Sequence, residues 1–253
     1  KAVLEETGLG ERVRWISGLA AAGEDGGISG CVFSNELFDS FPVRRFIGGR
    51  DGINEFFVDW KEDRFVEVRG KPGDSAPGEY FRALGSSLSE GRRADISFSA
   101  PEWMSSVGRL VKKGFVVTVD YGYPAEELFS ERLKRGTLLC YYRHTANDDP
   151  LSRVGEQDIT AHVDFSSLAR AGQAAGLEVT GFTNQLNFLM GLGVAEDMEG
   201  VDPEAPEMQA VKRLLARESM GGVFKVLIQH KGVKPPLLEG LAFRPFKRGV
   251  LGI

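Results

Sequence analysis

The sequence has little cysteine, little histidine and no long apolar run. Its two cysteines, Cys31 and Cys140, are too few for a disulfide framework or a thiolate metal site. Both fall in apolar, strand-like stretches, so we expect buried free thiols in a reducing compartment. No stretch approaches the roughly 18 consecutive apolar residues of a membrane span. A net charge of -5 argues against broad binding to nucleic-acid phosphates.

Two acids three residues apart follow a short apolar run near the start of the chain. Gly30–Phe33 is β-prone and unalternated, which predicts a parallel strand covered on both faces. The polar residues Asn35, Glu36 and Asp39 come directly after it. Ligands bind beyond the carboxyl ends of strands in open α/β sheets, so we expect these side chains at a functional site. A capped turn, with Asp39 beginning a helix, is the alternative.

Five parts of the chain resemble the motifs of one protein family. Asn35–Pro42 resembles the Asn-Glu-Phe-Phe-Asp-Ala-Leu-Pro signature of MidA-type proteins. The other matching segments, in the expected order, are Val119–Tyr123, Gly136–Leu138 with Tyr142–His144, Gly155–Phe165 and Gln185–Leu189. MidA-type proteins are S-adenosylmethionine-dependent methyltransferases and include a mitochondrial complex I assembly factor that methylates an arginine. The resemblance implies this cofactor and a protein partner methylated on arginine, in the cytoplasm if the source is bacterial and in mitochondria in eukaryotic relatives.

One element of such a methyltransferase is missing. A loop of the acidic-Gly-x-Gly-x-Gly type should follow the first strand, because glycine lets backbone N–H groups approach the cofactor. Gly23–Gly27 is glycine-rich but lies in a polar setting between elements, and the chain opens on Lys1. We expect that the first two strand-helix units precede Lys1, and that residues 1–253 form the rest of one methyltransferase domain.

The alternation of strands and helices agrees with the resemblance. Together they predict an α/β fold: a Rossmann-like class I methyltransferase sheet, mainly parallel, with an antiparallel meander and an inserted lid. The expected strands are Val13–Ile16, Cys31–Ser34, Phe115–Val119, Leu177–Phe182 and Phe224–Gln229, with a meander over Val43–Ile47, Glu55–Trp60 and Phe65–Val68. Ser99 and Glu102 predict a capping box for a helix that Gly114 ends, and Asp164 predicts the cap of another. Residues 123–163 have few periodic segments, so we place the lid there.

The acidic pair suits arginine chemistry. A guanidinium stays protonated, with a pKa above about 12, and is therefore a poor nucleophile. Two carboxylates can hold this planar cation by bidentate hydrogen bonds and favour charge on the attacking nitrogen. Glu36 and Asp39 are the candidate pair.

A histidine in the predicted lid is the second catalytic candidate. His162, with Asp164 beside it, can form a proton-accepting relay, or it can fix the lid while Asp164 only caps a helix. We assign Ile16 and Asn35, at two strand ends, to the cofactor S-adenosylmethionine. The residues expected to contact substrate from a strand end or from the lid are Asp120, Tyr121, His144, Asp158, Thr160 and Gln185.

Two other classes of function stay open. A metal-dependent hydrolase is one, because His-x-Asp and Asp-Asp pairs occur at metal sites, although the spacing here is loose. Its ligands would be His144, Asp148, Asp149, Asp158, His162 and Asp164. A non-catalytic assembly factor that grips a partner through an apolar surface patch is the other. That patch would comprise Phe182, Phe188, Leu189, Met190 and Leu192. Core packing is the more frequent explanation of apolar residues grouped in this way. We expect no metal site, because no tight ligand set is present.

Overall fold

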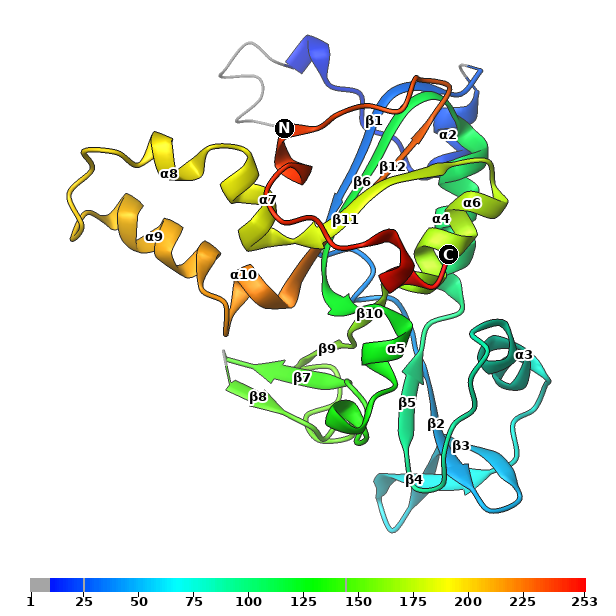
Figure 1. Cartoon of the computed structure of the whole chain (residues 1–253). Helices are drawn as coiled ribbons and strands as arrows, with labels where there is room; N and C mark the ends of the chain where they lie inside the picture. The colour runs from blue at the N-terminus through cyan, green and yellow to red at the C-terminus, as the bar shows by residue number, and fades with distance from the viewer. Residues whose placement is uncertain (1–9, 25, 144) are drawn as a thin grey trace.

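A five-stranded sheet forms the centre of the computed structural model, which describes residues 10–24, 26–143 and 145–253 (Figure 1). Its order is β1 (Ile28–Asn35), β6 (Val111–Tyr123), β12 (Phe224–Lys231) and β11 (Glu178–Asn184), with β10 (Val163–Asp164) also paired to β6. β1 and β10 run parallel to β6, whereas β12 is antiparallel to both of its neighbours. The expected α/β fold with a mainly parallel sheet is therefore confirmed, with β12 as the reversed strand that makes the sheet mixed.

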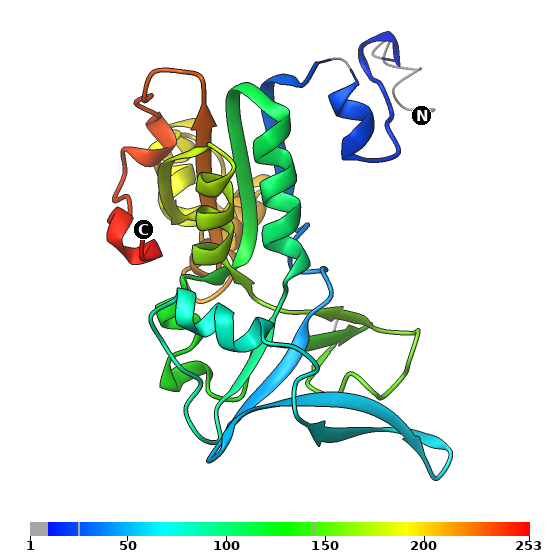
Figure 2. The same cartoon turned by 90° about the vertical axis from the view of Figure 1, so that its right-hand side faces the viewer.

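Two helices, α4 (Ser99–Leu110) and α6 (Phe165–Ala174), lie side by side against this sheet (Figures 1 and 2). Their apolar faces and the sheet enclose the main core, which includes the fully buried Met104, Phe165 and Leu168. Removing such side chains from water is the principal stabilising term of the fold. The core thus holds both helices against the sheet. The loop that follows β1 and carries Glu36 and Asp39, which we call the acidic loop, begins at the edge of this core.

The caps of these helices test two predictions. Asp164 Oδ1 accepts a hydrogen bond from the Ser166 N–H at 2.9 Å, so the predicted cap of α6 is confirmed. The capping box for α4 is wrong, because Ser99 is already helical and the Ala100 N–H donates to Ser97 Oγ at 3.2 Å. Gly114 does not end the helix either. The chain leaves it directly into β6, and Gly114 lies within that strand.

The predicted meander is confirmed and has one further strand. Its order is β4 (Arg64–Gly70), β3 (Gly52–Lys61), β2 (Arg44–Gly49) and β5 (Arg93–Ile96). The β3–β4 turn residues Glu62 and Asp63 have φ angles of 50° and 55°, as tight hairpins require. The helix α3 (Ala76–Ala83) contributes Phe81 to a separate core with Phe46 of β2.

Residues 123–163, predicted as a lid, contain a three-stranded sheet. Its order is β8 (Thr145–Asn147), β7 (Leu139–Tyr142) and β9 (Asp158–Thr160), preceded by α5 (Ala125–Leu128) and η2 (Glu131–Leu133). This sheet lies below the central sheet and beside the meander in Figure 1. Its action as a lid stays a prediction. His144 lies outside the described residues.

An arm of short helices connects β11 to β12 and projects from the central sheet (Figure 1). It consists of α7 (Gln185–Gly191), α8 (Val194–Asp197), α9 (Pro206–Leu215) and α10 (Met220–Val223). The remaining helical turns are η1 (Gly10–Arg12), α2 (Leu19–Gly23), η3 (Glu239–Leu241) and η4 (Arg248–Leu251). No helix in the described part of the chain is long and apolar enough to cross a bilayer.

The N-terminal strands differ from expectation. Residues 13–16 form no strand, and Trp15 is 64% exposed, because no strand of the described residues pairs with this segment. Nor is β1 covered on both faces. Among the strands of the described residues it pairs only with β6, and Phe33 is 65% exposed. For the same reason Cys31 is exposed, contrary to prediction, whereas Cys140 is buried as expected.

Candidate functional site

The loop that follows β1 is anchored to the end of β6. The Glu36 N–H donates to the Val119 carbonyl at 3.0 Å. Asp120 Oδ2 accepts the N–H groups of Leu37 at 3.1 Å and Phe38 at 2.9 Å. The Phe38 ring is buried in the main core. Hydrogen bonds on one side of the loop and a buried ring on the other therefore set the direction of its acidic side chains.

Two backbone features of this loop bear on function. Glu36 has a φ of 47°, a left-handed conformation that is uncommon outside glycine and recurs at functional sites. Asp39 lies in a turn closed by the Phe41 N–H on the Phe38 carbonyl at 3.2 Å. Asp39 therefore does not begin a helix, and the capping alternative is wrong.

Asp120 holds the loop and lies beneath it. Its side chain is fully buried, and Oδ1 accepts the Tyr121 N–H at 2.9 Å. Burial, reinforced by the negative charge of Asp39, raises the pKa of the Asp120 carboxyl to about 7, although backbone N–H donors oppose the shift. Asp120 does not line the cavity described next. Its contacts are those of an anchor, and the substrate contact predicted for it stays a prediction.

A cavity of about 590 Å³ brings six of the predicted residues together: Glu36, Asp39, Tyr121, Asp158, Thr160 and His162. We call it the acidic cavity, because its walls carry three carboxylates and no Lys or Arg of the described residues lines it. Its other walls are formed by Ser40, Tyr141, Ile159, Ser219, Met220, Val223 and Phe224. A cation entering this cavity would meet negative charge and aromatic faces.

The buried carboxylate of Asp39 is only half satisfied. The Tyr121 hydroxyl donates to Oδ2, whereas Oδ1 is buried without a hydrogen-bond partner among the described residues. Burial, followed by the hydrogen bond to Asp39, raises the pKa of the Tyr121 phenol, so the phenol stays protonated and keeps donating. A buried acceptor without a donor is costly, which fits a site that receives N–H groups from a ligand.

His162 is held close to the same residues. The Ala161 N–H donates to the Asp39 carbonyl at 3.1 Å, which ties the histidine segment to the loop. The His162 ring meets Tyr121 edge-on, with the ring centroids 5.8 Å apart. Burial lowers the pKa of His162 to about 4, and the positive charges of Lys225 and Arg132 add to the effect. The imidazole is therefore neutral at neutral pH.

His162→Gln should change how stability depends on pH. The folded-state pKa of His162 lies below the unfolded value of 6.5, so the unfolded chain binds the proton more readily. The neutral imidazole of His162 therefore contributes stability that is present above pH 6.5 and is lost as pH falls toward 4. Between pH 6.5 and pH 4, the free energy of unfolding of the wild type should therefore fall by on the order of 2–3 kcal/mol more than that of the variant, as measured by urea unfolding. A constant difference would show that His162 titrates normally.

Four predicted residues lie elsewhere. Both Asp164 oxygens are engaged, Oδ1 by the Ser166 N–H and Oδ2 by the Tyr80 hydroxyl, and this residue does not line the acidic cavity. Gln185 Nε2 donates to the Leu214 carbonyl at 3.0 Å and so joins two helices of the arm. Asn35 and Ile16 do not line the cavity either. Asn35 ends β1, whereas Ile16 lies in an irregular segment and is 47% exposed.

Sequence reasoning missed the cavity walls contributed by α10 and β12. β12 runs against β6, so Phe224 at its start is paired with Tyr121 at the end of β6. This pairing carries Met220 and Val223 of α10 to the same edge. No local signal in Ser219–Val223 indicates that placement. The direction of β12 would have to be known first.

The two alternative functions gain no support from the geometry. Among residues 10–24, 26–143 and 145–253, no group of three or more His, Cys, Asp or Glu side chains could hold a metal ion. Asp148 and Asp149 line a different cavity from Asp158. Within the proposed apolar patch, Phe182 is 1% exposed and stacks against Phe165, as a core residue does.

Comparisons with known proteins identify the family. Residues 1–183 match the family described as "Putative S-adenosyl-L-methionine-dependent methyltransferase". The chain belongs to this methyltransferase family. It is 27% identical over 193 residues to the mitochondrial protein arginine methyltransferase NDUFAF7 of Mus musculus, covering 74% of this chain and 41% of that protein. The NDUFAF7 of Rattus norvegicus is 28% identical over 167 residues, covering 64% of this chain and 35% of that protein.

Two solved structures have the same fold. A COG1565 superfamily member from Burkholderia thailandensis, bound to S-adenosyl-homocysteine, matches with a TM-score of 0.85 and 31% identity over 95% of this chain and 62% of that chain. A native COG1565 superfamily protein from the same organism matches with a TM-score of 0.86 and 30% identity over 97% of this chain and 66% of that chain. The chain thus spans less than half of the curated relatives and about two thirds of these structures.

S-adenosylmethionine is the cofactor of this family, and the end of β1 has polar groups to offer it. Asn35 is exposed, and its amide makes one long contact of 3.4 Å with Glu36 Oε1. Donor and acceptor capacity therefore remains at the carboxyl ends of β1 and β6, where nucleotide ligands bind in α/β sheets. No loop of the acidic-Gly-x-Gly-x-Gly type follows a strand in the described residues, so the strand-end residues account for only part of a cofactor site.

Proposed function

We propose that the full-length protein transfers a methyl group from S-adenosylmethionine to an arginine side chain of a protein partner. The observation that carries this proposal is the lining of the acidic cavity. Glu36, Asp39 and Asp158 line a space that, in the described part of the chain, no Lys or Arg lines. A guanidinium is the cationic group whose planar donors best match paired carboxylates. The names of the NDUFAF7 relatives support the same substrate class.

Binding falls to the acidic loop. Asp39 Oδ1, which has no partner among the described residues, is an acceptor for one guanidinium N–H, and Glu36 can accept another. Tyr121 holds the other Asp39 oxygen and so fixes the direction of the carboxylate. S-adenosylmethionine supplies an electrophilic methyl group when bound. The carboxylates stabilise the positive charge that builds up on the arginine nitrogen in the transition state.

Proton removal falls to His162. The arginine nitrogen that gains the methyl group must release a proton, and His162 is the imidazole that lines the same cavity. Aromatic and aliphatic side chains, among them Tyr141 and Met220, form the rest of the walls.

A labelling experiment tests the proposed function. Full-length protein is incubated with deuterium-labelled S-adenosylmethionine and proteins from source cells that lack its gene, and mass spectrometry locates the label. We expect labelled methyl groups on arginine, and far slower labelling with Glu36→Gln protein. Labelling confined to lysine, to a small molecule or to nucleic acid would contradict the proposal.

A further inference from the structure

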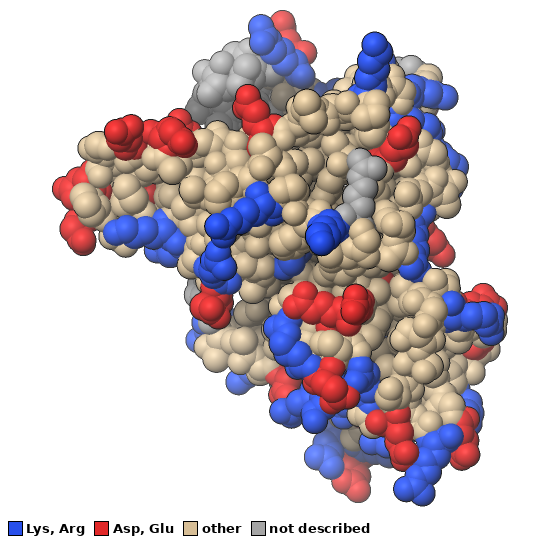
Figure 3. Space-filling model, viewed as in Figure 1, with Lys and Arg blue, Asp and Glu red and all other residues tan. Residues whose placement is uncertain are grey.

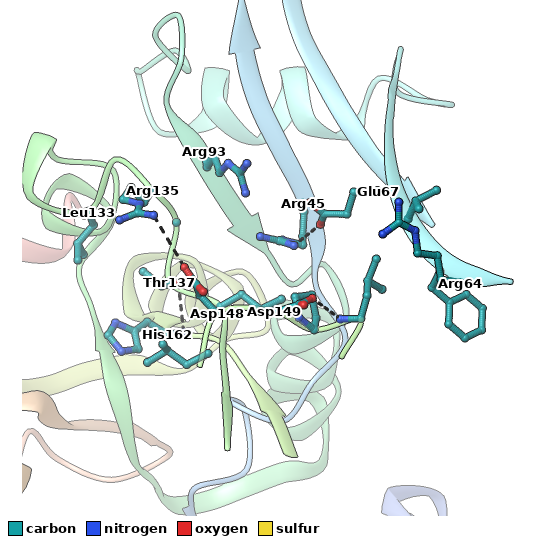
Figure 4. A pocket seen from close by; sticks show the side chains of 17 residues that line it. Arg45, Arg64, Glu67, Arg93, Leu133, Arg135, Thr137, Asp148, Asp149 and His162 are labelled. Atoms are coloured by element: carbon teal, nitrogen blue, oxygen red, sulfur yellow. Dashed lines mark hydrogen bonds and ion pairs between the residues drawn. The ribbon is translucent and has the colours of Figure 1, made fainter. Parts of the chain in front are cut away.

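A second cavity adjoins the acidic cavity and carries the opposite charge. It measures about 950 Å³, lies between the meander and the three-stranded sheet, and shares His162 with the acidic cavity. Its walls carry Arg45, Arg64, Arg93 and Arg135, and we call it the arginine cleft. Figure 4 shows His162 on one side of this cleft and Arg64 on the opposite side.

The arginines differ in how far their charge is already neutralised. Arg45 contacts two carboxylates, Glu67 and, at 3.2 Å, Asp95. Arg93 has no carboxylate partner among the described residues, and its guanidinium packs over the Phe56 ring with 4.8 Å to the centroid. Arg93 thus presents to the cleft a guanidinium that can receive a carboxylate.

Three acids, Glu67, Asp148 and Asp149, line the cleft beside its four arginines, which leaves one positive charge in excess. Asp149 Oδ1 accepts the N–H groups of Leu151 at 3.0 Å and Ser152 at 3.3 Å, so Asp149 closes its own turn. Asp148 lies 3.9 Å from Arg135, and the two side chains are 80% and 87% exposed. Such an exposed pair contributes little, so another carboxylate can replace Asp148 at low cost. On the face shown in Figure 3, basic and acidic side chains are interspersed over the lower half, without one broad basic patch.

We propose that the arginine cleft binds an acidic segment of the protein substrate while the acidic cavity binds the arginine beside it. This inference rests on the proposed function of the acidic cavity. The two cavities have opposite charges and meet at His162, so together they match a polypeptide in which an arginine neighbours aspartates or glutamates. Charge complementarity of this kind fixes the register of a bound chain and rejects other sequences.

Fluorescence anisotropy with full-length protein tests the proposal. One labelled peptide carries a central arginine flanked by glutamates, and a second carries glutamines in their place. We expect the glutamate peptide to bind at least about tenfold tighter, with the difference shrinking as salt is raised. Arg93→Gln should weaken the glutamate peptide about tenfold and leave the glutamine peptide unchanged.

Two further variants complete the test. Arg135→Gln, at a side chain 87% exposed, should also weaken the glutamate peptide, and it keeps the test intact should Arg93→Gln unfold. Arg50→Gln is the matched control, since Arg50 is 86% exposed on the β2–β3 turn and does not line the cleft. Equal binding of the two peptides, or equal loss in the Arg50 variant, would overturn the proposal. A single-stranded oligonucleotide that displaces the glutamate peptide at lower concentration would do so too.

Methylation assays on the two arginine peptides separate this proposal from the proposed function. Glutamate-dependent binding that needs Arg93, without methylation of any arginine peptide, would uphold the cleft and refute the methylation of arginine. Methylation of the glutamate and glutamine peptides with equal kcat/KM would uphold the function and refute the cleft.

Discussion

Replacing Glu36 by glutamine is expected to slow methyl transfer to arginine about 30- to 1000-fold in the full-length protein, with unchanged affinity for S-adenosylmethionine. The variant keeps the length and shape of the side chain but removes a negative charge from the acidic cavity. Charge develops on the arginine nitrogen mainly in the transition state, so the loss should appear in kcat more than in KM. Single-turnover kinetics and calorimetric titration of the cofactor measure the two effects.

Asp39→Asn should have a comparable effect for a related reason. Asparagine can still accept from Tyr121, but its amide would place either a donor or a weaker acceptor where Oδ1 now lies. Glu62→Gln is the matched control, because Glu62 is 85% exposed on the β3–β4 turn. Wild-type turnover in both Glu36 and Asp39 variants would mean that the loop is structural and that the proposed mechanism is wrong.

Much of the fold could be predicted because local patterns determine it. The meander follows from short β-prone runs separated by turn residues, and α6 follows from the Asp164 cap and its apolar face. Chain direction within the sheet is not a local property. Nothing in Phe224–Lys231 distinguishes a parallel strand from the reversed strand that the structure contains.

The same distinction holds for the site. Glu36 and Asp39 were predictable because they follow a strand directly, and the carboxyl ends of strands carry ligand sites. The role of Asp120 was not, because its oxygens reach across to the backbone of Leu37 and Phe38, more than 80 positions away in the chain. Asp164 was assigned to catalysis because it neighbours His162, yet the start of α6 turns it toward Tyr80.

Asp120→Ala should destabilise the protein by about 3–6 kcal/mol and reduce methyl transfer about 100-fold or more. The variant leaves the N–H groups of Leu37, Phe38 and Tyr121 without their acceptor. An unpaired donor costs about 1–3 kcal/mol, with the part-buried donors of Leu37 and Tyr121 at the lower end of that range. The released loop would also displace Glu36 and Asp39, and a shift of about 1 Å at a reacting group can cost about 100-fold in rate. Urea unfolding and the labelling assay measure the two losses.

Asp120→Asn refines this prediction, because the amide keeps the size of the side chain and one strong acceptor. The folded-state pKa of Asp120, about 7, lies above the unfolded value of 3.8, so its stabilising contribution is complete below pH 3.8 and is lost as pH rises through 7. Asparagine does not titrate, so the stability difference between wild type and this variant should shrink from pH 4 to pH 8.

Asp59→Ala, at an exposed acid of β3, is the control for Asp120→Ala and should change neither stability nor rate appreciably. If Asp120→Ala were as stable and as active as wild type, the loop would be held by the Phe38 ring and the Glu36 N–H alone, and Asp120 would be free for the substrate contact predicted from the sequence.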